Sequence, residues 1–172
     1  AEALKSEGNI GLAFTYNEPL IGYEYVRDCA ELCRARGLKT VLVTNGMILS
    51  EPWEKLLPLI DAANIDLKCF TPEGYRSLGG DMETVKTAIS LAAGRIHVEV
   101  TTLVVPGFND GEAEMRGIAR WLAGLKADVP LHISRFFPQY RMLDRAPTPA
   151  DTIGRLDAVA GEYLPNVYKG NC

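Results

Sequence analysis

The stretch Asn64-Ile-Asp-Leu-Lys68 alternates polar and apolar side chains, which is the period of a β-strand with one polar and one apolar face. The stretch His97-Val-Glu-Val-Thr101 repeats this pattern. A sheet covered by helices on both faces would have to bury a lysine and an aspartate. The interior of a β/α barrel that opens at the carboxyl ends of its strands accommodates both. The two stretches therefore favour a barrel over a doubly wound sheet.

Short strand-like runs alternate with longer amphipathic segments along the whole chain. The strand-like runs cover residues 10–16, 40–44, 63–68, 97–105, 131–137 and 166–168. Strand, helix and strand in strict order predict parallel strands joined by right-handed crossovers. A closed eight-stranded barrel takes about 250 residues, whereas this chain has 172. We therefore predict an α/β fold, a partial (β/α)6 TIM-like barrel of parallel strands with outer helices.

Composition narrows the functional classes. The chain is 47% hydrophobic and 23% charged, with a formal net charge of −4 and no basic block, which argues against nucleic acid or a membrane surface as partner. No run approaches the roughly 18 apolar residues of a spanning helix. The four cysteines are too few and too unevenly spaced for a disulfide framework, so we expect a cytoplasmic location.

Two segments at strand ends carry candidate charged ligands. Thr15-Tyr-Asn-Glu-Pro19 ends the first strand and starts a helix, and Glu18 is placed there to hold a cation. The simpler interpretation of this segment is a helix start, capped by Asn17 and followed by Pro19 in the first turn. Asp66 and Lys68 share a face about 6.6 Å apart along the strand. They form either a structural ion pair or a binding site for a zwitterion or a ribose.

Both histidines lie on predicted strands. His97 is near the start of its strand and is best explained as hydrogen-bonded barrel filling, whereas Glu99 and Thr101 lie nearer the carboxyl end and remain candidates. His132 lies across the sheet from Asp66, which favours a role in the site. The segment 104–110 predicts a wide turn whose exposed backbone is suited to meet a flat ring.

Cys29 and Cys33 have the C-x-x-x-C spacing of the first two ligands of an iron–sulfur site. Three residues beyond Cys33 the sequence has Arg36 where a third thiolate would be needed. The pair also lies within a predicted helix, on one apolar stripe with Val26 and Ala30. We therefore interpret both cysteines as buried core residues and reject them as a metal site.

Five motifs, taken in order, resemble those of the radical S-adenosylmethionine (SAM) superfamily. The similarity is greatest to enzymes that resemble pyruvate formate-lyase activating enzyme, in particular the branch called AmmeMemoRadiSam system radical SAM enzyme. The motifs are Gly11-Leu-Ala-Phe-Thr-Tyr-Asn-Glu-Pro19, Thr44-Asn-Gly46, Asn64-Ile-Asp-Leu-Lys68, Val104-Val-Pro-Gly-Phe-Asn-Asp110 and His132-Ile-Ser-Arg-Phe-Phe-Pro138.

The resemblance implies an oxidoreductase that cleaves SAM reductively, with a [4Fe–4S] cluster, to a 5′-deoxyadenosyl radical. It implies that Glu18, beside Asn17, takes the SAM amino group, and that Asp66 and Lys68 contact its ribose and carboxylate. The same resemblance puts Thr101 and His132 in the SAM-binding set, with His132 on the ribose side. The segment 104–110 would then line the adenine side.

The sequence departs from the family in one respect. The three cluster cysteines, spaced C-x-x-x-C-x-x-C, and the first barrel strand are absent, and residues 1–8 match the tail of the first family helix. We therefore expect residues 1–172 to form a single, N-terminally truncated core domain, inactive alone, whose full-length form carries the cluster. The resemblance implies a reductant such as flavodoxin or ferredoxin. The substrate is open between a protein glycyl-radical site and a small molecule.

Two alternatives belong to other functional classes. The first is a Schiff-base aldolase barrel with Lys68 as the nucleophile at a strand end. The second is a non-catalytic barrel domain that binds a ligand without chemistry. Borohydride trapping on Lys68 distinguishes the first, and the sequence encoded upstream of Ala1 distinguishes the second.

Overall fold

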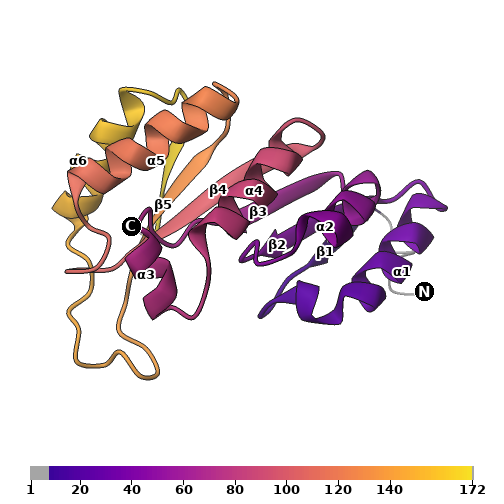
Figure 1. Ribbon diagram of the computed structural model, residues 1–172, viewed down its shortest axis with the longest axis horizontal. Coiled ribbons are helices and arrows are strands. Elements are labelled where there is room, and N and C mark those ends of the chain that lie inside the picture. The colour runs from indigo at the N-terminus through magenta and orange to yellow at the C-terminus, as the bar shows by residue number, and fades with distance from the viewer. Residues whose placement is uncertain (1–7, 172) are drawn as a thin grey trace.

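The computed structural model describes residues 8–171, which form one sheet of six parallel strands with helices packed along it (Figure 1). The strands are β1 (Gly11–Phe14), β2 (Lys39–Thr44), β3 (Ala62–Asp66), β4 (His97–Val104), β5 (Leu131–Arg135) and β6 (Val167–Gly170). The α-helices are α1 (Tyr23–Arg34), α2 (Ser50–Leu56), α3 (Pro72–Ser77), α4 (Met82–Ala93), α5 (Glu112–Leu125) and α6 (Ala150–Gly161), and the 3-10 turns are η2 (Pro19–Gly22) and η3 (Leu57–Leu59). The strand order follows the sequence and β1 does not pair with β6, so the predicted open partial barrel is confirmed.

The helices bury one face of the sheet. On β4 the residues Val98, Val100 and Val104 point toward the helices and are at most 4% exposed. Trp53 of α2 packs in the same layer, and its indole N–H donates to the Ala88 carbonyl at 2.9 Å. This layer is the apolar core.

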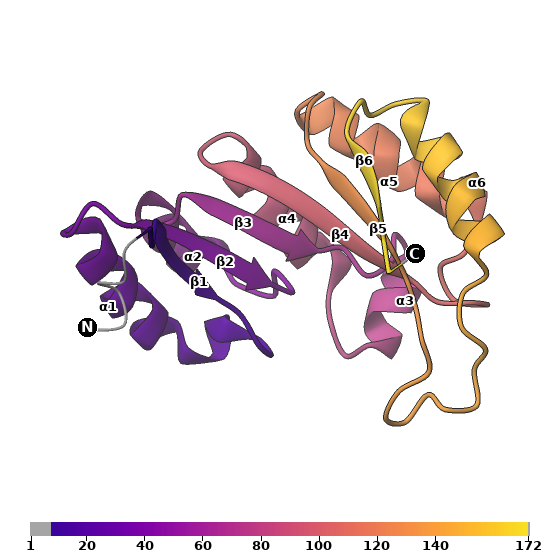
Figure 2. The same cartoon turned by 180° about the vertical axis from the view of Figure 1, so that it is seen from behind.

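The opposite face of the sheet is seen in Figure 2. Its side chains on β3 and β4 are mostly polar and only partly buried. Strand register places Asp66 beside Thr101, Thr101 beside His132, and His132 beside Tyr168. The next polar residues toward the amino ends of the strands, Asn64 and Glu99, also pair. The alternation in residues 64–68 and 97–101 therefore gives the shared polar face that the sequence predicts.

One local expectation differs from the structure. Glu18 caps η2 by accepting from the Leu20 N–H, so Asn17 is not the cap. Thr148, just before α6, donates its hydroxyl to the Val104 carbonyl at 2.6 Å. The helix tail expected at residues 1–8 lies almost wholly outside the described residues, as does Cys172.

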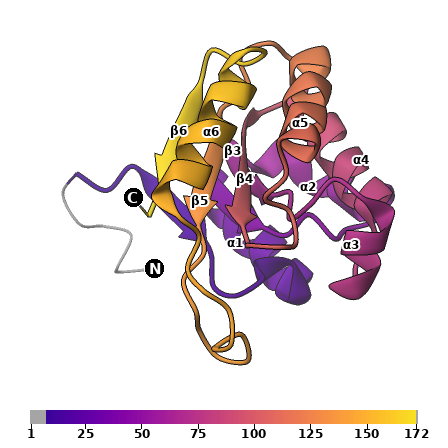
Figure 3. The ribbon, with the colours of Figure 1, turned by 90° about the vertical axis from the view of Figure 1, so that its left-hand side faces the viewer.

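The connection from β5 to α6 projects beyond the carboxyl ends of the strands (Figure 3). Its two ends are held together by Thr148. The Thr148 N–H donates to the Phe136 carbonyl, the Thr148 hydroxyl accepts from the Phe136 N–H, and the Thr148 carbonyl accepts from Arg135 Nε at 2.9 Å. Farther out, Arg145 donates to the Pro106 carbonyl at 3.0 Å. Within residues 8–171, no helix combines the length and the apolar character needed to cross a membrane.

At the amino ends of the strands, Asp61 joins β2 to β3. Its carboxylate accepts from Lys39 Nζ at 2.6 Å and from the Thr40 N–H at 2.9 Å. The hydrogen bond from Lys39 lowers the pKa of Asp61 below its ordinary value of 3.8, and it outweighs the opposing effect of burial. A lowered carboxyl pKa stabilises the fold above pH 3.8, and this contribution disappears as the pH falls through the folded-state value.

We therefore expect Asp61→Asn to lower the free energy of unfolding at pH 7 by about 1 kcal/mol, a value that allows for solvent screening of a side chain 38% exposed. Urea denaturation at pH 7 and near pH 3 measures the difference in the free energy of unfolding between variant and wild type, which should be smaller at the lower pH. Glu51→Gln, which removes a fully exposed ion pair with Lys55, is the control and should change nothing measurable. An equal gap at both pH values would contradict the assignment.

Candidate functional site at the carboxyl ends of the strands

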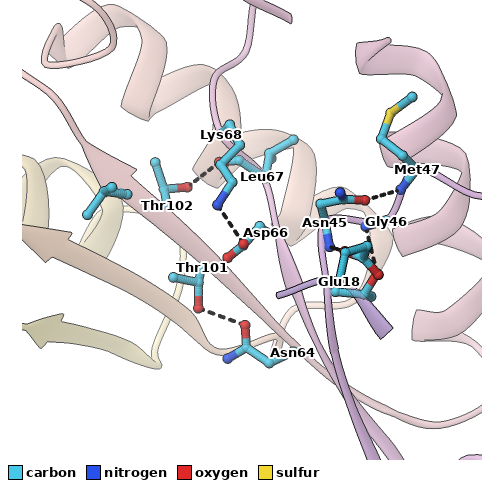
Figure 4. A network of polar contacts seen from close by, with 12 residues as sticks. Glu18, Asn45, Gly46, Met47, Asn64, Asp66, Leu67, Lys68, Thr101 and Thr102 are labelled. Carbon is cyan, nitrogen blue, oxygen red and sulfur yellow. Dashed lines mark hydrogen bonds and ion pairs between the residues drawn. The ribbon is translucent and has the colours of Figure 1, made fainter. Parts of the chain in front are cut away.

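Polar side chains from β1, β2, β3 and β4 meet near the carboxyl ends of the strands (Figure 4). In parallel β/α barrels this end carries the active site, because the loops that vary in sequence gather there. One group is built around Asp66 and Lys68 and the other around Glu18 (Figure 4). The sequence-predicted residues therefore fall into two neighbouring clusters on adjacent strands.

Asp66 and Lys68 form an ion pair on the polar face, with Lys68 Nζ 2.5 Å from Asp66 Oδ2. Their side chains are 27% and 39% exposed, so both remain accessible to a ligand. The Lys68 N–H donates to the Tyr75 hydroxyl at 3.1 Å, and burial raises the pKa of that hydroxyl, which keeps it protonated. Lys68 also lines a cavity of about 370 Å³ with Leu103 and Phe108. The pair is thus both held by the fold and open to solvent.

Glu18 is held by the turn that follows β2. Its Oε1 accepts from the Thr44 hydroxyl at 2.7 Å, and its Oε2 accepts from the Asn45 N–H at 2.6 Å. That turn needs glycine at position 46, where φ is +70° and an added Cβ would lie 2.9 Å from Ile65 Cγ2. The carboxylate consequently joins two strand ends, and Glu18 also lines the groove beside β1.

Asn17 is exposed next to Glu18, and both line that groove, which has a volume of about 550 Å³. No hydrogen bond from the Asn17 side chain is found within residues 8–171. Thr44 and Asn45 were not predicted as partners of Glu18. The only sequence signal was the Asn-Gly pair, which by itself indicates a turn.

Thr101 and His132 lie on the next strands. The Thr101 hydroxyl donates to Asn64 Oδ1 at 2.8 Å. His132 Nε2 lies 2.8 Å from Glu99 Oε2, and its ring stacks on Tyr168 with centroids 5.3 Å apart. Burial raises the pKa of Glu99, but hydrogen bonds from His97 and His132 outweigh burial and leave the pKa below its ordinary value. Glu99 is therefore a carboxylate at neutral pH.

Asn109 fixes the loop after β4 against the site, and sequence reasoning did not single it out. Its side chain is 2% exposed and makes three hydrogen bonds. Oδ1 accepts from the Val105 N–H at 2.7 Å, while Nδ2 donates to the carbonyls of Lys68 at 2.7 Å and Leu103 at 2.8 Å. The carboxamide thereby joins the ends of β3 and β4.

The donor set fits a small zwitterionic ligand that carries hydroxyls. Lysine pairs with a carboxylate, whereas Asp66 and Glu18 suit an ammonium group or sugar hydroxyls. An iron–sulfur cluster does not fit: Cys33 and Cys69 are each 1% exposed, and Cys29 and Cys33 lie on α1. Within the part of the chain that the structure describes, no three acidic, histidine or cysteine side chains are arranged to hold a metal ion.

The open parallel barrel thus carries an acid–lysine pair at the carboxyl ends of its strands, the end where β/α-barrel enzymes have their active sites. The family profile described as Radical SAM superfamily matches residues 1–121. The uncharacterized protein MJ0808 of Methanocaldococcus jannaschii is 39% identical over 168 residues, covering 94% of this chain and 49% of that protein. The chain therefore belongs to the radical SAM superfamily.

Further comparisons place the chain within this family. The pyruvate formate-lyase 1-activating enzyme of Escherichia coli K12 is 30% identical over 106 residues, which cover 59% of this chain and 43% of that enzyme. A domain of pyruvate-formate lyase-activating enzyme from Bacteroides vulgatus has the same fold, with a TM-score of 0.79 at 18% identity over 94% of this chain and 99% of that domain. The chain spans about half the length of the curated relatives it matches.

Proposed function

We propose that this chain is the SAM-binding core of a radical SAM enzyme. The observation that carries the proposal is the Asp66–Lys68 pair, which is accessible on the polar face at the carboxyl end of β3. SAM presents a carboxylate, an ammonium group and a ribose diol on one flexible molecule. Lys68 offers a positive charge to the carboxylate, while Asp66 beside it and Glu18 after β1 offer carboxylate oxygens to the ammonium group and the diol.

Each residue has one role in this proposal. Lys68 binds the SAM carboxylate, and Asp66 accepts from the ribose hydroxyls. Glu18, beside Asn17, accepts from the amino group with the lone pair that Leu20, Thr44 and Asn45 leave free. Thr101 and His132 line the ribose side, and the segment 104–110 lines the adenine side.

Radical SAM enzymes use a [4Fe–4S] cluster to supply the electron that cleaves SAM reductively to a 5′-deoxyadenosyl radical. Residues 1–172 lack the C-x-x-x-C-x-x-C motif, and the cysteines that the structure describes do not fit a cluster. We propose that residues 1–172 act as one domain whose cluster ligands lie outside it, so that the chain alone binds SAM without cleaving it. A glycyl-radical protein or a small molecule would be the substrate, with flavodoxin or ferredoxin as reductant and the cytoplasm as location.

The Schiff-base alternative is less well supported. A Schiff-base lysine attacks a carbonyl as a free, neutral amine. Lys68 instead lies 2.5 Å from the Asp66 carboxylate. We expect no substrate trapped on Lys68 by borohydride, and trapping would favour the aldolase interpretation.

Titration of the chain with SAM tests the proposal directly. We expect saturable binding with a Kd of about 0.1 to 1 mM, or roughly −4 to −5.5 kcal/mol. NMR should show the largest chemical-shift changes at the carboxyl ends of β3, β4 and β5. Anaerobic reconstitution should leave the chain without a stoichiometric cluster. If SAM at five times the upper end of this Kd range causes no chemical-shift changes, the proposed binding role is wrong. Four irons per chain after reconstitution would refute the proposal that the cluster ligands lie outside residues 1–172.

A further inference from the structure

The Glu99 carboxylate on β4 lies between the imidazoles of His97 and His132. It is nearer the amino ends of the strands than the Asp66–Lys68 pair. Glu99 Oε1 is 3.2 Å from His97 Nε2, and Glu99 Oε2 is 2.8 Å from His132 Nε2. The Glu99 and His132 side chains are 35% and 31% exposed, whereas His97, at the start of β4, is 56% exposed. The contact of Glu99 with His132 is thus shorter and more buried than its contact with His97.

This contact determines which ring nitrogen of His132 carries the proton. An ionised carboxylate only accepts hydrogen bonds, so the nitrogen that faces it must be a donor. His132 Nε2 is therefore protonated, and in the neutral ring Nδ1 is the acceptor. Within residues 8–171, no protein group makes a hydrogen bond to Nδ1. Stacking on Tyr168 fixes the plane of the ring.

His132 is separated from the Asp66–Lys68 pair across the polar face of the sheet. In the strand register, Thr101 separates His132 from Asp66, so their backbones lie two strand spacings or about 10 Å apart. The titratable groups on this face near His132 are Asp66 and Lys68 on β3, His97 and Glu99 on β4, and Tyr168 on β6. Asp66 is already paired with Lys68, which leaves Glu99 as the carboxylate in contact with His132.

We propose that Glu99 is a positioning residue, which holds His132 in the Nε2–H tautomer so that Nδ1 accepts a hydrogen bond from a ribose hydroxyl of bound SAM. This inference rests on the proposed SAM-binding function. Glu99 itself does not touch the ligand. It acts through the imidazole, by fixing both the orientation of the ring and the nitrogen that remains free to accept.

Glu99→Gln tests the proposal because it keeps the size of the side chain and removes the charge. The carboxamide can donate to Nε2 as well as accept from it, so it permits both tautomers of His132. Long-range 1H–15N NMR of the histidine ring should show Nε2–H in the wild type at neutral pH and a mixture in the variant. The Kd for SAM should rise about tenfold. A tautomer is a readout that a merely structural role of Glu99 would leave unchanged.

His97→Gln is the matched control, because His97 contacts the other oxygen of the same carboxylate. We expect the His132 tautomer to be unchanged and the Kd for SAM to stay within twofold of the wild type. If wild type binds SAM and Glu99→Gln alters neither the tautomer nor the Kd, the positioning role is wrong while the proposed function stands. A changed tautomer with an unchanged Kd also overturns it. A wild-type chain that does not bind SAM overturns the proposed function itself, and with it the role given to Nδ1.

Discussion

Replacing Asn109 with alanine is expected to lower the free energy of unfolding by about 3–5 kcal/mol. The substitution leaves the Val105 N–H and the carbonyls of Lys68 and Leu103 without their partner, in a place where the side chain is 2% exposed. Each buried polar group that loses its hydrogen bond costs about 1–3 kcal/mol. Partial relaxation of the loop keeps the total below the sum of three such losses.

Urea denaturation followed by circular dichroism measures this loss as a shift of the midpoint at constant m-value. Asn109→Asp is a second, sharper variant, because it keeps the shape and puts a carboxylate against the carbonyls of Lys68 and Leu103, to which it cannot donate. We expect it to be at least as destabilising as alanine at pH 7. Asn166→Ala removes one exposed hydrogen bond to Asp128 and should cost less than about 0.5 kcal/mol. Equal losses for Asn109→Ala and Asn166→Ala would show that the carboxamide does not hold the loop.

Asn109 also shows why part of the site could not be predicted. Its segment, Val105-Pro-Gly-Phe-Asn109, contains turn-forming residues, and a local pattern of that kind predicts a turn and nothing more. What makes Asn109 important is the Lys68 carbonyl, 41 positions away in the sequence. The partners of Glu18 at the end of β2 are likewise 26 and 27 positions away. Hydrogen bonds of this range depend on the packing of strands that local sequence does not specify.

The polar face of the sheet, in contrast, could be predicted from the sequence. Alternation in residues 64–68 and 97–101 fixes which side chains share a face, because the side-chain period of a strand is two. The structure then pairs Asn64 with Glu99 and Asp66 with Thr101 in register. The contact between Glu99 and His132 was not predicted. Alternation places residues on a face but does not measure how far a side chain reaches across to the next strand.

Lys68→Met is expected to raise the Kd for SAM about 10- to 100-fold, the second large effect. A hydrogen bond to a charged group contributes about 1.5–3 kcal/mol, and methionine keeps most of the length and apolar character of the lysine side chain. Stability should change by less than about 1 kcal/mol, because the ion pair with Asp66 is partly exposed, at 39% and 27%. Calorimetric or NMR titration with SAM, together with urea denaturation, separates the two effects.

Lys68→Arg distinguishes a SAM carboxylate ligand from a Schiff-base nucleophile, because arginine keeps the positive charge and cannot form an imine. If Lys68 binds a carboxylate, Lys68→Arg should keep the Kd for SAM within about tenfold of wild type, well below the effect of Lys68→Met. Asp66→Asn should weaken SAM binding by a similar factor to Lys68→Met, because it removes the negative charge and replaces one of the two acceptor oxygens that face the ribose hydroxyls with a donor. The double variant should then show less than the product of the two single effects, since the two side chains are coupled at 2.5 Å. Equal affinities for the Lys68→Met variant and the wild type would remove Lys68 from the site and leave the proposed function without its main support.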